Sequence, residues 1–329
     1  MMNAHSTAAL LDPREQHYRI PGQQGLSLFL RYMAPAPEAK RDAGVVLYVH
    51  GGTFPSALSI AHRLDGQSWR DALCAAGFHV WGLDFHGFGR LSDPYPEMLS
   101  PAKDAPPLGR VGEACSQLEQ AVRFIRAHHG GPRVSIVAHS WGTMVTGLFA
   151  GRHPELMDRL VFFGPIAPRP PSGKAVQLPA WRLISLQDQW DRFTGPVPKG
   201  TANVLSHRHF DTWGEAYLNC DPESRNRSPA AVLVPSGAFQ DIYDAWTGVL
   251  PYDPALIRAP VAIVRGEWDD MCNDGDAGWL FNALTAASVR RDVKIGRATH
   301  LMHLESARFA LYRETEAFLT GGDIAELDT

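Results

Sequence analysis

Ala138-His139-Ser140-Trp141-Gly142 follows the apolar run 134–137 and precedes the helical spacing of 143–150. The pattern predicts a strand, a tight turn that carries one serine, and a helix. A serine on such a strained turn projects its hydroxyl away from the backbone, and the next N–H points at the group that the hydroxyl attacks. Ser140 is therefore a candidate nucleophile. Strings of this kind also arise by chance, so the prediction depends on which other residues the fold brings to Ser140.

Length and composition describe a globular chain with room for a large core. The 329 residues are 45% hydrophobic and 20% charged, which is ordinary for such proteins. A formal charge of -4 gives no basic surface for nucleic acid, and no run approaches the roughly 18 apolar residues of a membrane span. The four cysteines lack metal-ligand spacing, and residues 1–16 lack the charged and apolar regions of a signal peptide. We expect a cytoplasmic protein that binds neither nucleic acid nor membrane.

Apolar runs typical of buried strands alternate with helical spacing through most of the chain. Such alternation predicts an α/β fold, with a mostly parallel sheet and helices on both faces. The alternation of strand and helix stops in the segment 167–258, which is rich in proline and aromatic residues. We therefore predict a core in two parts, 1–166 and 259–329, with a cap inserted at 167–258. The expected strands are 16–20, 26–32, 45–49, 78–84, 134–139, 160–163, 261–264 and 291–295, and the expected helices are 68–76, 111–128, a helix from the Ser140 turn to about 152, 276–284 and 304–320.

Reactive residues follow three further strands of this predicted sheet. Parallel sheets bind ligands beyond the carboxyl ends of their strands, and His50-Gly51-Gly52-Thr53 follows the strand at 45–49. Glycines let a backbone approach a substrate closely. Gly52 or Thr53 is expected to donate one N–H to a developing oxyanion, with the N–H of Trp141 as its partner. A glycine turn beside a buried structural histidine is the alternative interpretation.

An acidic stretch follows the strand at 261–264. A carboxylate in this place can orient a histidine and stabilise its cation. Asp269 is the residue we expect to do so, with Asp270 and Glu267 as alternatives. A solvated acidic turn is the other interpretation.

Two histidines, His300 and His303, lie in the loop before the last predicted helix. His300 lies outside that helix and is expected to reach Ser140 as a general base. His303 is expected to pack or cap beneath it. The order of oxyanion loop, serine, acid and histidine is the order of an α/β-hydrolase, and four unrelated features would rarely fall into it.

From about residue 25 to residue 320 the chain resembles the α/β-hydrolase superfamily. The resemblance lies in the stretches 50–52, 84–90, 138–142, 266–269 and 299–305. It implies an eight-stranded sheet with a helical cap between strands six and seven. It also implies that Ser140 is the nucleophile, Asp269 the acid and His300 the base.

The serine at the turn narrows the chemistry that this resemblance implies. Haloalkane dehalogenases and epoxide hydrolases of the family carry aspartate there, whereas esterases, lactonases, C–C hydrolases and aminopeptidases use serine. The stretches 53–56, 81–84 and 138–144 are similar to a bacterial subgroup of capped hydrolases near which serine-dependent macrolide esterases fall. This similarity implies a bulky lactone, and hence antibiotic inactivation, as a candidate activity.

We therefore expect a serine hydrolase that opens a small-molecule ester or lactone without a metal or an organic cofactor. An aminopeptidase or C–C bond hydrolase with the same triad is the alternative within enzymes, and a ligand-binding protein with slow turnover is the alternative outside them. The H-x-H-x-D spacing of 207–211 lacks further metal ligands and is expected to be cap surface or substrate wall. The residues expected to contact substrate are His50, Phe54, His139, Met302, Trp181 and Trp213.

Overall fold

The computed structural model describes residues 11–22, 25–171 and 176–321. Its central sheet has eight strands in the order β1-β2-β4-β3-β5-β6-β9-β10. The pairs β1–β2 and β2–β4 are antiparallel, and the other neighbouring pairs are parallel. The mostly parallel eight-stranded sheet predicted from the sequence is therefore confirmed. The strands are β1 (Gln16–Pro21), β2 (Ser27–Met33), β3 (Gly44–Val49), β4 (Phe78–Asp84), β5 (Val134–His139), β6 (Met157–Phe163), β9 (Val261–Gly266) and β10 (Arg290–Ile295).

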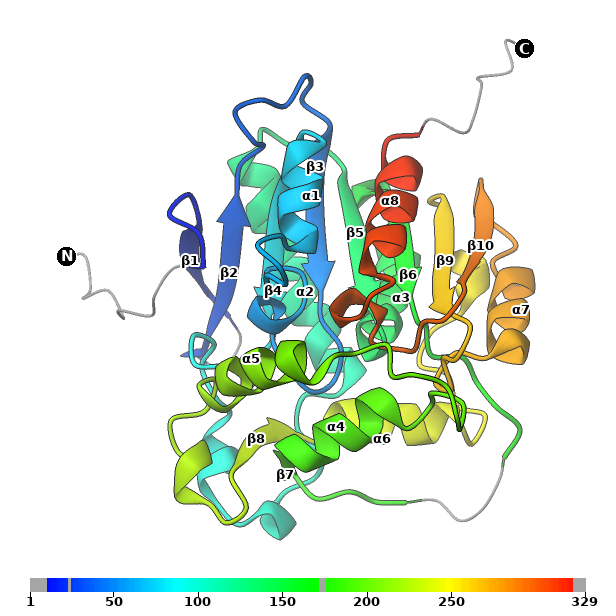
Figure 1. The fold of residues 1–329 in the computed structure, drawn as a ribbon. Helices are drawn as coiled ribbons and strands as arrows, with labels where there is room; N and C mark the ends of the chain where they lie inside the picture. The colour runs from blue at the N-terminus through cyan, green and yellow to red at the C-terminus, as the bar shows by residue number, and fades with distance from the viewer. Residues whose placement is uncertain (1–10, 23–24, 172–175, 322–329) are drawn as a thin grey trace, which may run out of the picture.

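Helices cover both faces of this sheet, as Figure 1 shows. Successive strand residues point to opposite faces, so Val46 and Tyr48 pack in the core cluster beneath α1 (Trp69–Ala75) and α8 (Arg308–Leu319). Leu47 and Val49 pack in the second cluster. That cluster is covered by α2 (Val111–His128), α3 (Trp141–Arg152) and α7 (Asp274–Ala283). Burial on both faces explains why β3 is an unbroken apolar run.

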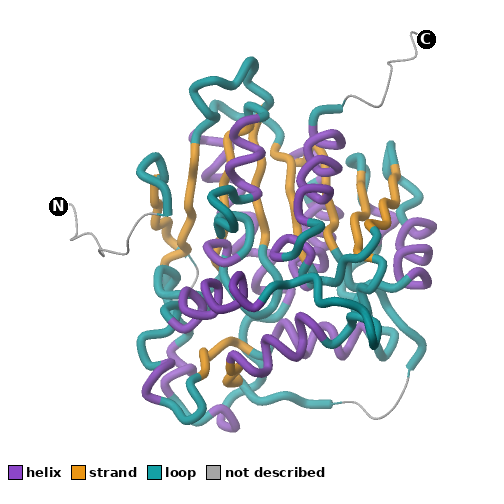
Figure 2. The backbone as a smooth tube through the Cα atoms, viewed as in Figure 1, coloured by secondary structure: helices purple, strands orange, loops and turns teal. Residues whose placement is uncertain are grey.

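The cap lies between β6 and β9 and covers the end of the sheet to which the β3 arrow points (Figure 1). The sequence predicted a helical cap, and the structure adds a two-stranded antiparallel sheet of β7 and β8 (Figure 2). These strands were missed because each has five residues and β7 is only partly buried. The elements of the cap are β7 (Trp181–Ser185), α4 (Leu186–Thr194), α5 (His207–Leu218), β8 (Ala231–Pro235) and α6 (Gly237–Ala245).

The last helix begins later than the sequence predicted. Residues Met302–Leu304 form a short 3-10 turn, and α8 starts at Arg308 rather than at 304. The side chain of Glu305 is bonded to Thr299 across this turn, which holds the intervening residues out of the helix.

None of the helices among the described residues is both long enough and apolar enough to cross a membrane. Residues 1–10, part of the segment compared with a signal peptide, lie outside the described residues.

Candidate active site

Ser140 occupies the turn between β5 and α3 with φ 56° and ψ −126°. A positive φ is uncommon for a residue with a side chain and stores strain. Three hydrogen bonds to the backbone of Ser140 hold this conformation. Its N–H donates to the carbonyl of Phe163 at 2.9 Å, and its carbonyl accepts the N–H of Thr143 at 2.9 Å and the Thr143 hydroxyl at 2.6 Å. The turn geometry therefore does not depend on the serine hydroxyl, which makes no hydrogen bond within the described residues.

His300 contacts one of the three acidic residues proposed to orient it. Its Nδ1 lies 2.9 Å and 3.0 Å from the two carboxylate oxygens of Asp269, and both residues are buried. Asp269 Oδ1 also accepts the backbone N–H of Cys272 at 2.9 Å. The rival Asp270 is exposed, and Glu267 accepts a backbone N–H from the neighbouring loop. The structure thus brings Asp269, and neither alternative, to His300.

Two glycines that the sequence analysis did not single out allow this contact. Gly164 has φ 54°, and a Cβ there would lie 2.8 Å from His300 ring atoms and 3.0 Å from Asp269 Oδ2. At Gly266, where β9 ends, a Cβ would lie 2.2 Å from the carbonyl oxygen of Ala298. The loops that carry Asp269 and His300 therefore cross at a distance only glycine permits. The sequence signal was a glycine at the end of a predicted strand, directly after 160–163 for Gly164 and two residues after 261–264 for Gly266.

His139 joins the Ser140 turn to the His300 loop. Its Nε2 lies 3.0 Å from the carbonyl oxygen of His300, and the two rings are 4.9 Å apart. Burial places the pKa of His139 well below its usual value, so the ring is neutral and donates this bond. A Cβ at Gly51 would lie 3.1 Å from Ser140 Cβ and 3.3 Å from His139 Nδ1. Ser140, His300 and the first glycine of the oxyanion loop are thus gathered around one histidine.

The Nε2 atom of His300 is buried and has no hydrogen-bond partner among the described residues. In a catalytic triad this atom accepts the proton of the serine hydroxyl. The two are not hydrogen-bonded in this structure. Bonds of this kind are often long in unliganded enzymes and tighten when substrate binds.

Three backbone N–H groups beside Ser140 are available to an oxyanion. Within the described part of the chain, those of Gly52, Thr53 and Trp141 donate to no protein acceptor. A Cβ at Gly52 would lie 4.0 Å from Trp141 Cβ, so the loop runs beside the start of α3. Both Gly52 and Thr53 remain candidates for the second donor.

Two hydrogen bonds of the His50 ring stabilise the oxyanion loop. Its Nε2 accepts the N–H of Phe85 at 3.2 Å, so its Nδ1 carries the proton and donates to the carbonyl of Gly51 at 2.6 Å. Burial lowers the pKa of His50, which keeps the ring neutral. Its two bonds fit the structural role that the sequence left open, rather than a contact with substrate.

Phe54 and Trp213, two expected substrate contacts, are buried and pack against each other where core and cap meet. Their rings are 5.2 Å apart, and Phe54 also lies 6.1 Å from the ring of His303. His303 and Met302 are buried, and burial lowers the pKa of His303 to about 3. His303 therefore packs beneath the His300 loop, as expected, in its neutral form.

Trp181 is not brought to this group. It stands at the start of β7, partly exposed, and its indole donates to the carbonyl of Ser100 at 3.0 Å. No contact links it to Ser140 or His300 among the described residues. Its expected contact with substrate therefore has no support from its position.

The histidines of the 207–211 motif have other partners. His207 stacks on Trp190 at 4.3 Å, and His209 pairs with Asp65 at 3.0 Å. Across the ranges that the structure describes, no group of three or more histidine, cysteine, aspartate or glutamate residues could hold a metal ion.

Asp241 is a buried carboxylate that the sequence did not distinguish from other acidic residues of the cap. It accepts from the indole of Trp141 at 2.9 Å, from the N–H of Val111 at 2.8 Å and from the guanidinium of Arg110. Burial nevertheless raises its pKa. Because α6 carries Asp241, this carboxylate fixes the cap to the residue that follows Ser140.

Glu305 closes the loop that carries His300. Its carboxylate accepts the N–H of Thr299 at 3.0 Å and also the Thr299 hydroxyl. Glu305 is fully buried, and burial raises its pKa to about 7. The two ends of the loop are therefore joined through the side chain of Glu305, which titrates near neutral pH.

We expect Glu305→Gln to remove a pH-dependent loss of stability. The Glu305 side chain has a pKa of 4.5 in the unfolded chain, whereas burial raises this pKa to about 7 in the folded protein. As the pH rises from 4.5 to 7, the free energy of unfolding of the wild type should therefore fall by about 3 kcal/mol relative to that of the variant. Chemical denaturation from pH 4 to pH 8 measures the difference, with exposed Glu38→Gln as the control. Parallel curves for wild type and Glu305→Gln would contradict the expectation.

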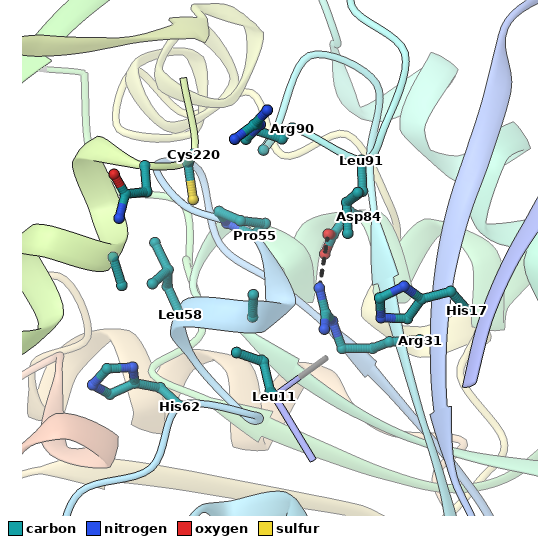
Figure 3. Close-up of a pocket in the computed structure, with 14 residues that line it drawn as sticks. Leu11, His17, Arg31, Pro55, Leu58, His62, Asp84, Arg90, Leu91 and Cys220 are labelled. Carbon is teal, nitrogen blue, oxygen red and sulfur yellow. Dashed lines mark ion pairs between the residues drawn. The ribbon is translucent and has the colours of Figure 1, made fainter. Parts of the chain in front are cut away.

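A cavity of about 550 Å³ lies apart from the candidate catalytic residues (Figure 3). Pro55, Leu58 and Cys220 line it, together with the ion pair of Arg31 and Asp84. None of Ser140, Asp269 and His300 borders it. It is therefore a separate feature at the junction of core and cap.

Comparison with protein families matches residues 44–307 to a family described as the alpha/beta hydrolase fold. No curated protein matches the chain. Among solved structures, a monoacylglycerol lipase from Paleococcus ferrophilus is 16% identical, with a TM-score of 0.57 over 89% of this chain and 98% of that one. An esterase from Exiguobacterium antarcticum is 13% identical, with a TM-score of 0.60 over 92% and 99%. An esterase domain of a Rhodothermus marinus protein is 15% identical, with a TM-score of 0.54 over 93% and 98%. At these identities the likeness establishes the fold.

Proposed function

Because this chain belongs to the α/β-hydrolase fold family, we propose that it is a serine hydrolase that cleaves a carboxylic ester or lactone. Ser140 is the nucleophile, His300 the base and Asp269 the acid of this proposal. The observation that carries it is the buried contact between His300 Nδ1 and Asp269, at 2.9 Å and 3.0 Å, beside the strained turn of Ser140. An imidazole held in this way keeps its proton on Nδ1 and leaves Nε2 free to accept another.

The proposed reaction has two steps. Ser140 Oγ bonds to the carbonyl carbon while its proton passes to His300 Nε2, and the alcohol departs with that proton as the ester C–O bond breaks. Water then bonds to the acyl carbon and gives one proton to His300, and His300 passes that proton to Ser140 Oγ as the bond between Oγ and the acyl carbon breaks and the carboxylic acid leaves. The N–H groups of Trp141 and of Gly52 or Thr53 stabilise the oxyanion in both steps.

Two features bear on the substrate. The sequence similarity to macrolide esterases favours a bulky lactone, and the aromatic rings of Phe54 and Trp213, packed where core and cap meet, suit an apolar group. An aminopeptidase needs a free carboxylate for the substrate amine. Asp241, an acidic residue close to Ser140, already accepts three protein donors and is a poor candidate for that role.

Covalent labelling combined with a substrate panel tests the proposal. We expect a fluorophosphonate to modify the peptide that contains Ser140, and an unlabelled sample to hydrolyse p-nitrophenyl esters, a macrolide lactone or both faster than an amino-acid anilide. Ser116→Ala, whose hydroxyl bonds only within α2, is the control and should label normally. Labelling of another residue, or a preference for the anilide, would contradict the ester hydrolase. Tight binding of a panel member with negligible release of product would favour a ligand-binding protein.

A further inference from the structure

Arg192 on α4 is a partly buried cation whose guanidinium forms no ion pair within the described residues, although the more distant charge of Asp270 favours it. Its Nη2 donates to the Thr53 hydroxyl and to the side-chain oxygen of Gln189, each at 2.7 Å. No carboxylate of the described residues forms an ion pair with it. Burial lowers its pKa to about 10, so it is cationic at neutral pH. Because the N–H groups of Arg192 that bond to no protein acceptor are open to a ligand, an anion is the ligand that this guanidinium would bind most strongly.

Arg192 lies at the candidate active site. Thr53, which it contacts, belongs to the oxyanion loop. The carbonyl oxygen of the next residue, Phe193, lies 3.5 Å from the hydroxyl oxygen of Thr299, so the end of α4 packs on the loop that carries His300. The charge of Arg192 also contributes to the low pKa of His139, after burial and the neighbouring histidines.

A pocket of about 240 Å³ begins at this guanidinium. It is lined by Arg182, Leu183, Ile184, Asp188, Arg192 and Phe239. The Arg182 guanidinium lies 4.4 Å from the centre of the Phe239 ring. Asp188 is the anion of the pocket, and its carboxylate accepts the N–H and hydroxyl of Ser185. Two cations against one anion leave the pocket with a net positive charge.

Two residues that line the pocket, Arg192 and Phe239, connect it to the oxyanion loop, Arg192 by its own contact with Thr53 and Phe239 through its neighbour. Ala238, the neighbour of Phe239, lies against the loop, since a Cβ at Gly52 would be 2.8 Å from Ala238 Cβ. The Arg192–Thr53 contact is therefore the direct link between the pocket and the oxyanion loop.

We propose that Arg192 and Arg182 bind a carboxylate carried by the substrate, so that the preferred ester or lactone is an anion. This inference rests on the proposed function and names its substrate class. A guanidinium has five N–H donors, and two of those of Arg192 are used. The rest are available to carboxylate oxygens, which form stronger hydrogen bonds with guanidinium than neutral acceptors do. Neutral and cationic substrates would leave Arg192 without a counterion.

Matched esters test the substrate class. Monoethyl adipate, ethyl adipamate and ethyl aminohexanoate share a leaving group and differ in a terminal carboxylate, amide or ammonium. A second pair, acetylglycolate and acetylglycolamide, carries the difference on the leaving group. We expect kcat/KM to favour the carboxylate about 10- to 100-fold over the amide in at least one series, and the ammonium ester to be the poorest. Equal rates for carboxylate and amide in both series would overturn the inference.

Variants assign the preference to the pocket. Arg192→Gln and Arg182→Gln should each reduce the ratio of carboxylate to amide rates, and Arg192→Lys should retain part of it. The ratio cancels any general loss of activity that follows from the lost contact with Thr53. Arg208→Gln, on an exposed cap arginine paired with Asp65, should leave the ratio unchanged. A ratio that survives both glutamine variants would contradict the assignment.

A binding measurement separates this inference from the proposed function. Calorimetry of monoethyl adipate with Ser140→Ala requires no turnover, and we expect affinity that falls about tenfold or more with Arg192→Gln in the same background. Ser140-dependent hydrolysis without a carboxylate preference would overturn the inference and leave the hydrolase. Arg192-dependent binding without hydrolysis of any ester would keep the anion pocket and contradict the hydrolase. Absence of both would overturn both.

Discussion

Replacing Ser140 with alanine is expected to lower kcat by about 10⁴- to 10⁶-fold on the best ester of the panel. The variant has no nucleophile, so no acyl-enzyme forms, and what remains is stabilisation by the oxyanion donors and binding. Initial rates by pH-stat measure the loss. Ser116→Ala is again the control and should retain wild-type rates.

The fold should tolerate this change. All three hydrogen bonds that hold the turn involve the backbone of residue 140, and alanine carries the same Cβ at φ 56° as serine. The melting temperature of Ser140→Ala should therefore stay close to that of the wild type. Undiminished hydrolysis by a folded Ser140→Ala protein would refute the assignment of the nucleophile.

Asp269→Asn is expected to reduce kcat by about 10⁴-fold. Asp269 Oδ1 accepts the N–H groups of Met271 and Cys272, at 3.0 Å and 2.9 Å. In the variant the amide oxygen must take this place, which turns the amide NH₂ toward His300 Nδ1. The ring then carries its proton on Nε2 and cannot accept that of Ser140.

The neighbouring acids supply the controls for this prediction. Asp270→Asn and Glu267→Gln change residues that do not contact His300, and each should alter kcat less than about threefold, as surface changes away from a site usually do. Steady-state kinetics of the three variants on one ester show which of the three acidic residues orients His300. A loss as large in Asp270→Asn as in Asp269→Asn would contradict the tautomer argument.

The sequence predicted the core of the sheet better than the cap. Strands such as β3 are buried on both faces and read as apolar runs, so composition alone identifies them. β7 is short and partly exposed, and its pairing with β8, nearly fifty residues later in the chain, leaves no local pattern.

The candidate site divides in the same way. Ser140 stands in a pattern set by strand, turn and helix, and His300 precedes a helix, so both were identified from neighbouring residues. Asp269 and Asp270 are adjacent, and which carboxylate turns inward depends on the fold of the loop. Arg192 and Asp241 lie in the cap and are hydrogen-bonded to residues of the core, Thr53 and Trp141 respectively. Sequence spacing does not reveal such contacts.

The strand order has a consequence for biosynthesis. β5, which leads to Ser140, lies inside the sheet, whereas β9 and β10 are added at its edge after the cap has been made. Chains emerge from the ribosome with their N-terminal part first. On the proposed mechanism, a nascent chain displays its nucleophile for the time needed to make some 160 further residues before His300 arrives. On that mechanism the growing polypeptide is inert until His300 has been made and its loop has reached Ser140.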